Sequence, residues 1–355
     1  MTPPPRTIRI GLLICGSLSG PVEAVHGGYH EIYSHYWKST IPRGSNASVI
    51  IDSYSIKNME FPDEDRLDEY DIFMVTGSAT SACDDTIPWV RELLAFLKGL
   101  VQNHPKVKLC GICFGHQIVS RALGGDCVLN DQWEIGPIPI ALSEAGKSVF
   151  GVDQLTLQQI HRDHVPVESF SKHLTSGEIE LVGSTGPTPN QGIIKFYPST
   201  SGDAIKTPRN VHVLTLQGHP EFSEGIITGL VRQRVDAFGL PTVTEYWGHK
   251  GGEDAHEPTD KEGTGRRWHK TDGADIVSQA LWKMLGVAPD SVDAHDKPKH
   301  KGDTTSTSHE GGALGIICSS ETVGKSSFSS WWRLTDGLSH ISNLLWRVFG
   351  LASWW

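Results

Sequence analysis

One junction constrains the fold of this chain more than any other feature. An apolar segment runs without a break into a glycine-flanked cysteine, and a helical pattern follows. In the run Leu-Cys-Gly-Ile-Cys-Phe-Gly-His-Gln, residues 109–117, Cys113 stands between Gly111 and Gly115. A nucleophile on so sharp a strand-to-helix turn needs neighbours without side chains, because larger residues would clash there. The pattern is typical of a nucleophile elbow at the end of a sheet.

Short apolar runs rich in β-branched residues alternate along the chain with segments of helical periodicity. The apolar runs predict strands at residues 7–15, 48–54, 71–76, 107–112 and 211–216. The periodic segments predict helices at 27–39, 88–100, 117–123 and 226–238. Such alternation is typical of a mostly parallel central sheet with helices on both faces, so we expect an α/β fold.

Composition separates a globular part from a polar C-terminal part. We expect one domain over 7–248, a polar loop over 249–273, a C-terminal helix of the domain over 274–287, a disordered linker over 288–330 and a tryptophan-rich amphipathic tail over 331–355. The loop and the linker are poor in apolar residues, as exposed or disordered segments are. The tail fits either a helix that lies on a membrane or a partner, or a poorly ordered end. Its polar face has few basic residues, which argues against membrane contact.

The bulk properties exclude several classes of protein. A formal charge of −10 over 355 residues argues against nucleic-acid binding, which needs clustered Lys and Arg. The six cysteines are sparse and lack zinc-finger spacing, so we expect reduced thiols. The N-terminus lacks a basic segment and a cleavage site, and no run approaches the roughly 18–20 apolar residues of a membrane span. We therefore expect a cytoplasmic protein.

A second motif supplies partners for the cysteine. The run Gln-Gly-His-Pro-Glu, residues 217–221, directly follows the predicted strand at 211–216. Residues two apart in an extended segment share a face, so His219 and Glu221 can point the same way. His219 could then take the thiol proton of Cys113 while Glu221 orients the imidazole. Alone, Cys113 could be a structural cysteine and His219 a surface histidine, but together they favour catalysis.

The two motifs, in this order and in these contexts, resemble the class I (triad) glutamine amidotransferases. The similarity covers roughly residues 7 to 245 and includes stand-alone members related to the amidotransferase domain of GMP synthase. It implies a flavodoxin-like, three-layer α/β fold and a catalytic triad of Cys113, His219 and Glu221.

The resemblance also implies roles around the triad. Backbone N–H groups of Gly77 and Phe114 would form the oxyanion hole. The loop from Thr76 to Ser81 departs from the Gly-Gly-Pro-Gly form of many members, which leaves the donor and the substrate open. The residues that match positions lining the α-amino and carboxylate end of the substrate are Gln117, Trp133 and Glu134. Trp133 could equally be a core aromatic residue.

The activity implied by the resemblance is hydrolysis of a γ-glutamyl amide, with a small-molecule substrate and neither cofactor nor metal. Three alternatives stay open from the sequence. The chain could be a glutaminase-type enzyme with a separate synthase partner, a stand-alone γ-glutamyl peptidase acting on glutathione-like compounds, or a catalytically silent regulatory module. Related proteases and chaperones carry His directly after the nucleophile, where this chain has Phe114, which argues against them.

Overall fold

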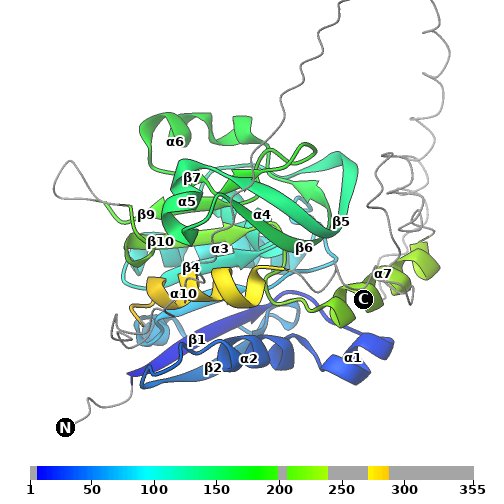
Figure 1. The fold of residues 1–355 in the computed structure, drawn as a ribbon, viewed down its shortest axis with the longest axis horizontal. Helices are drawn as coiled ribbons and strands as arrows, with labels where there is room; N and C mark the ends of the chain where they lie inside the picture. Colours follow the sequence, from blue (N-terminus) through cyan, green and yellow to red (C-terminus); the bar gives the residue numbers. More distant parts are fainter. Residues whose placement is uncertain (1–5, 199–205, 239–270, 288–355) are drawn as a thin grey trace, which may run out of the picture. The chain divides into compact units, whose positions relative to one another are not determined.

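The computed structural model describes residues 6–198, 206–238 and 271–287 (Figure 1). The linker predicted over 288–330 and the tail predicted over 331–355 lie outside the described residues, as does all but the end of the loop predicted over 249–273.

Seven strands form the central sheet, in the order β2-β1-β3-β4-β10-β9-β7. The first five are parallel, and β9 and β7 continue the sheet antiparallel. Their bounds are β1 Arg6–Ile14, β2 Ala47–Ser55, β3 Ile72–Val75, β4 Lys108–Ile112, β7 Glu180–Leu181, β9 Ile193–Phe196 and β10 Val211–Leu216. Every residue of β3 and β10 is buried, as strands covered on both faces require. The predicted mostly parallel α/β sheet is confirmed.

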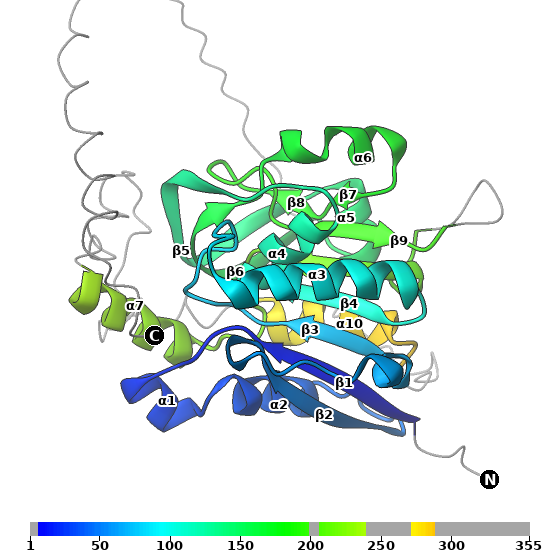
Figure 2. The same cartoon turned by 180° about the vertical axis from the view of Figure 1, so that it is seen from behind.

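Helices cover both faces of this sheet, and the alternation of side chains along each strand explains how. On β3, Ile72 and Met74 belong to one hydrophobic cluster, while Phe73 and Val75 belong to the other. The first cluster includes α2 (Tyr29–Ser39) and α10 (Ser278–Met284), and the second includes α3 (Pro88–Asn103) and α4 (Phe114–Ala122). Figure 1 shows α10 in front of the sheet, and Figure 2, from behind, shows α3 in front.

The remaining helices are shorter or lie at the edges. They are α1 Gly20–His26, α5 Glu144–Phe150, α6 Ser171–Ser176 and α7 Glu224–Phe238. The helix predicted from residue 274 begins as a π-helical turn over Gly273–Val277 and continues as α10. Trp282 of α10 packs edge-on against Trp37 of α2, with ring centroids 5.1 Å apart, and this contact docks the segment on the core.

A second, antiparallel sheet was not predicted. Its strands are β5 (Val128–Leu142), β6 (Gln154–His164) and β8 (Gly183–Ser184), in the order β6-β5-β8. Pro137 and Pro139 lie within β5, and proline inside a run normally argues against a strand. The β5–β6 pair packs on the cluster that contains α2 and α10, and His219 donates its backbone N–H to Gln158 of β6.

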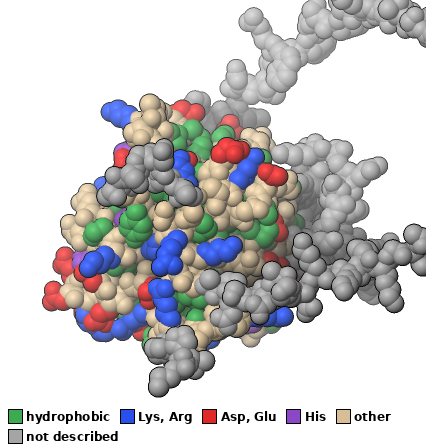
Figure 3. Space-filling model, turned by 60° about the vertical axis from the view of Figure 1, so that its left-hand side comes forward, with side chains coloured by type: hydrophobic (Ala, Val, Ile, Leu, Met, Phe, Trp, Pro, Cys, Tyr) green, Lys and Arg blue, Asp and Glu red, His purple; other side chains and the backbone are tan. Residues whose placement is uncertain are grey.

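The surface and the thiols bear on the remaining expectations. Side chains of both charges are interspersed on the face in Figure 3. Five cysteines lie in the described part of the chain, and all are free thiols: Cys15, Cys83, Cys110, Cys113 and Cys127. Among the described residues, no helix is both long and apolar enough to cross a membrane. The cytoplasmic location stays a prediction.

Candidate active site

Cys113 lies at the junction of β4 and α4, in a backbone conformation that few residues adopt. Its φ is 54° and its ψ is −108°. In the described part of the chain, Met59 is the only other non-glycine residue with positive φ. The N–H of Cys113 donates to the carbonyl of Leu216 in β10, at 2.9 Å. Such strained positions cost of order 1–3 kcal/mol and cluster at functional sites. The surrounding sheet therefore holds the cysteine in a strained turn.

The two glycines of the elbow are explained by close approaches of the backbone. A Cβ atom on Gly111 would lie 2.4 Å from the carbonyl oxygen of Gly115. A Cβ on Gly115 would lie 2.2 Å from the carbonyl oxygen of Val75 in β3. Both distances are far below van der Waals contact, so side chains at these positions would push α4 away from the sheet.

His219 and Glu221 follow β10 and form a buried pair. Nδ1 of His219 lies 2.8 Å from Oε1 of Glu221, and the same oxygen accepts a hydrogen bond from the Tyr33 hydroxyl at 3.1 Å. The imidazole stacks on the ring of Phe222, with centroids 4.0 Å apart and planes at 4°. These contacts fix the ring through Nδ1 and leave Nε2 available. Among the described residues, Nε2 of His219 has no hydrogen-bond partner that meets normal geometry.

The thiol and the imidazole lie beside one another at Gly77. A Cβ atom on Gly77 would lie 2.8 Å from Cε1 of His219 and 3.7 Å from Cβ of Cys113. Gly77 itself is positioned by Thr76, whose hydroxyl donates to the Gly77 carbonyl and accepts the N–H of Cys15. The structure thus brings together the three residues predicted as a triad and the glycine predicted as an oxyanion donor.

The electrostatics of the site favour a charged imidazole. Burial disfavours the imidazolium, yet the Glu221 carboxylate and the Cys113 thiol outweigh it and raise the pKa of His219 to about 10. Burial, followed by the charge of Glu221, raises the pKa of Tyr33 well above its usual range, so the phenol stays a donor. The charged imidazole and the Cys113 sulfur thus line the same cavity.

A cavity of about 60 Å³ opens on Cys113 and His219. Its other walls come from the loops after β1 and β3, from α2 and β6, and from α7 with the segment that leads into it. They are formed by Ser17, Leu18, Ser19, Tyr29, Ser78, Ala79, Ile160, Phe222, Leu230 and Gln233. The mixture of apolar side chains with hydroxyl and amide groups suits a small polar molecule.

Phe114 contributes to the elbow through its backbone. It is the first residue of α4, and the first N–H groups of a helix have no intrahelical partner. Its side chain is buried and packs on Trp89, with ring centroids 5.5 Å apart. The backbone N–H can therefore serve the site while the ring serves the core.

The residues predicted to bind the substrate are not among those that line the cavity. Gln117 is buried and its amide donates to the carbonyl of Asp163 at 2.9 Å. Glu134 is buried, with a carboxylate oxygen 3.2 Å from Nε2 of His161 and 2.7 Å from the amide of Gln191. Trp133 is partly buried against the cluster that contains α2 and α10. Their contact with a substrate stays a prediction.

The sequence reasoning missed two residues of this site. Tyr33 lies 188 residues before Glu221, and no local pattern links them. Phe222 stacks on His219, and the only sign of this in the sequence is that an aromatic residue directly follows Glu221. A separate group of possible metal ligands, Cys83, Cys127 and Asp163, lies outside the cavity lining.

Comparison with known proteins places this geometry in a family. No family model matches the chain. A protein of Schizosaccharomyces pombe that is named glutamine amidotransferase-like is 31% identical over 223 residues, which cover 60% of this chain and 79% of that protein. Gamma-glutamyl peptidase 4 of Arabidopsis thaliana is 35% identical over 213 residues, or 58% of this chain and 72% of the peptidase.

Among solved structures, a glutamine amidotransferase from Thermotoga maritima aligns with a TM-score of 0.47 and 17% identity, over 78% of this chain and 98% of that one. The sequence relatives carry the assignment, because they combine more than 30% identity with most of their own length. This chain belongs to the class I glutamine amidotransferase-like family.

Proposed function

We propose that this protein hydrolyses a γ-glutamyl amide through a thioester on Cys113, with His219 as proton carrier and Glu221 as its orienting partner. The observation that carries the proposal is the shared cavity wall. Cys113, in its strained turn, and His219, with Nε2 available, both line the cavity, while Nδ1 of His219 is held by Glu221.

In the first half of the reaction, the Cys113 thiolate attacks the γ-carbonyl carbon and a tetrahedral oxyanion forms. The N–H groups of Gly77 and Phe114 would stabilise that oxyanion, and losing one such donor typically costs ~10²–10³ in rate. The His219 imidazolium then donates its Nε2 proton to the leaving nitrogen. The carbon–nitrogen bond breaks, an amine or ammonia departs, and a γ-glutamyl thioester remains.

In the second half, His219 is neutral and accepts a proton from water. The resulting hydroxide attacks the thioester carbonyl, the carbon–sulfur bond breaks, and the product leaves as the γ-carboxylic acid, which then loses its proton to solvent. The thiolate and the imidazolium are restored. The stack of His219 on Phe222 and its bond to Glu221 support this exchange, because they hold the ring in one orientation through both halves.

Two leaving groups fit this chemistry. The glutamine amidotransferase-like relative favours ammonia from free glutamine, in which case a separate synthase partner would consume the ammonia. The relatives named gamma-glutamyl peptidase favour an amino acid or peptide amine instead. Both substrates present the same γ-carbonyl to Cys113, so the proposal covers both.

Parallel assays of the full chain distinguish the two. Glutamate, ammonia and free amine would be measured after incubation with glutamine and with γ-glutamyl dipeptides. Cys113→Ser should abolish release from whichever compound is the substrate. Cys110→Ala is the matched control, because Cys110 is a buried thiol three residues away that does not line the cavity. Folded wild-type protein that releases nothing from either substrate class would contradict the proposal and favour a silent regulatory module.

A further inference from the structure

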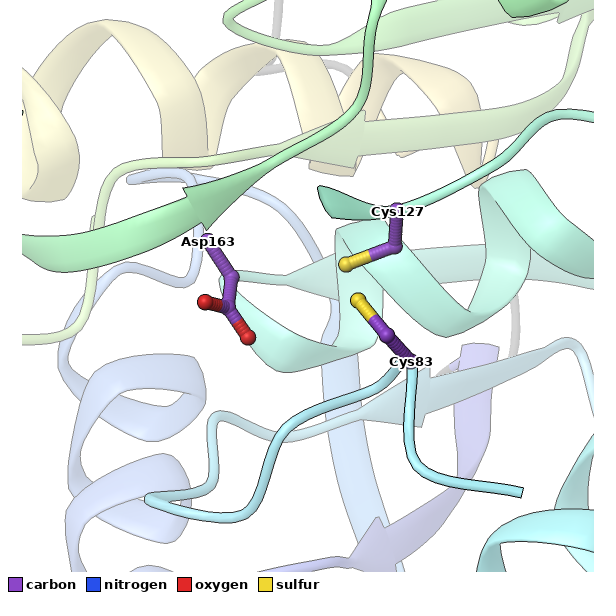
Figure 4. A group of neighbouring side chains, drawn as sticks. All are labelled: Cys83, Cys127 and Asp163. Carbon is purple, nitrogen blue, oxygen red and sulfur yellow. The ribbon is translucent and has the colours of Figure 1, made fainter. Parts of the chain in front are cut away.

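Two cysteines outside the cavity, Cys83 and Cys127, have side chains that lie close together. Figure 4 shows the sulfur atoms of Cys83 and Cys127 pointing toward one another, with the Asp163 carboxylate beside them. The two sulfurs and a carboxylate oxygen all lie within 4.8 Å of one another. Cys83 lies in the connection between β3 and α3, Cys127 directly precedes β5, and Asp163 is near the end of β6. The pair therefore links segments that are distant in sequence.

The two thiols differ in environment. Cys127 is 3% exposed, whereas Cys83 is only partly buried. The closeness of the two thiols lowers the pKa of Cys83 and raises that of Cys127, which burial raises further. The Arg121 guanidinium donates to the carbonyl of Ala82, next to Cys83, at 2.6 Å. Cys83 is thus the accessible thiol with thiolate character, and Cys127 is a sheltered thiol within its reach.

We propose that Cys83 and Cys127 form a reversible disulfide by exchange with a low-molecular-weight disulfide. The Cys83 thiolate attacks one sulfur of that reagent, whose S–S bond breaks and releases one small thiolate. Cys127 gives its proton to that thiolate and attacks the Cys83 sulfur, and the second small thiolate leaves. Two protein thiols are oxidised, and one small disulfide is reduced to two thiols.

The surroundings favour this chemistry over a metal ion. Structural zinc sites normally have four protein ligands, and this group offers three. The Asp163 carboxylate already accepts a hydrogen bond from the Ser81 hydroxyl, at 2.6 Å. The positive charge of Arg121 adds to the lowering of the Cys83 pKa and opposes the raised pKa of Cys127, so a cation already acts on these sulfurs.

Formation of the bond would move the loop after β3. A disulfide needs its sulfur atoms about 2.05 Å apart. Cys127 is buried and directly precedes a strand, whereas Cys83 is only partly buried and lies in a loop, where its own N–H reaches the Ser81 hydroxyl at 3.3 Å. The displacement should therefore fall on the Cys83 side and pull Ser81 from Asp163. Ser78 and Ala79, earlier in the same loop, line the catalytic cavity. Oxidation should consequently alter catalysis, a consequence that rests on the proposed function.

Cross-link mapping tests the disulfide without reference to activity. The full chain carrying Cys113→Ser would be treated with cystamine, digested without reduction and analysed by mass spectrometry. We expect a peptide pair joined through Cys83 and Cys127 with two hydrogens lost, reversed by dithiothreitol. The pair should be absent from Cys83→Ser and Cys127→Ser versions, in which a lone thiol can form only a mixed disulfide. A cystamine adduct that persists on Cys83, pairing with another cysteine, or stoichiometric Zn²⁺ that protects both thiols from alkylation would overturn the proposal.

The regulatory consequence is tested on the catalytically intact chain. Oxidation should lower kcat/KM by about tenfold or more, because a displaced wall of a site commonly costs that much. Dithiothreitol should restore the rate. Under the same oxidant, Cys83→Ser should lose less of its rate than the wild type, because only direct oxidation of the Cys113 thiol remains. Full cross-linking with unchanged kcat/KM would overturn the regulatory role. A reduced enzyme without any activity would instead count against the proposed function and leave the cross-link result standing.

Discussion

Replacing Glu221 by Gln removes one negative charge from the site and keeps the shape of the side chain. The carboxylate is fully buried, accepts hydrogen bonds from His219 and Tyr33, and is a main reason why the pKa of His219 is raised to about 10. In the Gln variant, the amide can still accept from Tyr33, but it no longer stabilises an imidazolium.

The size of the effect follows from these contacts. A hydrogen bond to a charged group contributes about 1.5–3 kcal/mol. The rise of the His219 pKa from 6.5 to about 10 shows a preference for the imidazolium that is of the order of several kcal/mol, of which Glu221 supplies the largest favourable part. If about 3 kcal/mol of this is lost in the transition state, kcat/KM falls by about 100-fold.

The assay is kcat/KM for γ-glutamyl hydrolysis from pH 5 to 10.5 or so. Because the carboxylate raises the pKa of His219, its removal must lower that pKa, and the alkaline limb should move from near pH 10 toward neutrality. Circular dichroism and the thermal midpoint would establish that the variant is folded. A folded Glu221→Gln enzyme that keeps most of its kcat/KM, with the alkaline limb unmoved, would refute the role given to Glu221.

Three further predictions concern the same site. Gly77→Ala should lower kcat by about 10²-fold or more with little change in the thermal midpoint, because its Cβ would lie 2.8 Å from His219 and displace the imidazole; an unchanged kcat would contradict this. Tyr33→Phe should lower kcat/KM by about tenfold, since Glu221 loses one hydrogen bond but keeps its charge, and equal losses in Tyr33→Phe and Glu221→Gln would argue against that division. The raised pKa of His219 stabilises the fold fully below about pH 6.5, and this contribution is lost as the pH rises toward 10. Urea unfolding of wild type and His219→Gln should therefore show a stability difference that shrinks over that window, and a difference that grows would reverse the assigned sign.

The sequence predicted the five parallel strands of the central sheet but not β7 or β9, and the signal was strongest for the strands that are buried on both faces. A strand such as β10 (Val211–Leu216) must be apolar throughout, and that signal survives without tertiary information. The elbow was equally predictable, because the turn requires residues without side chains and the sequence has glycine there. The close backbone contacts of Gly111 and Gly115 explain this requirement.

What the sequence could not predict depends on contacts between distant segments. The β5–β6 pair was missed because Pro137 and Pro139 lie within β5, and proline inside an apolar run normally argues against a strand. Helix α1 (Gly20–His26) was missed because a segment of seven residues that starts with glycine shows little helical periodicity. Without β5 and β6, the pairing of Glu134 with His161 across adjacent strands could not be anticipated. Whether a side chain such as Glu134 can reach a substrate depends on the buried partner that fixes its position, and the sequence does not reveal that partner.

Trapping of the nucleophile tests the central claim most directly. The intact chain would be incubated with a glutamine-mimicking electrophile, and the modified residue would be identified by mass spectrometry. The account predicts a single adduct on Cys113, abolished by Cys113→Ser and slowed by competing substrate. Modification at Cys83 or elsewhere with Cys113 untouched, or none at all in folded protein, would contradict it.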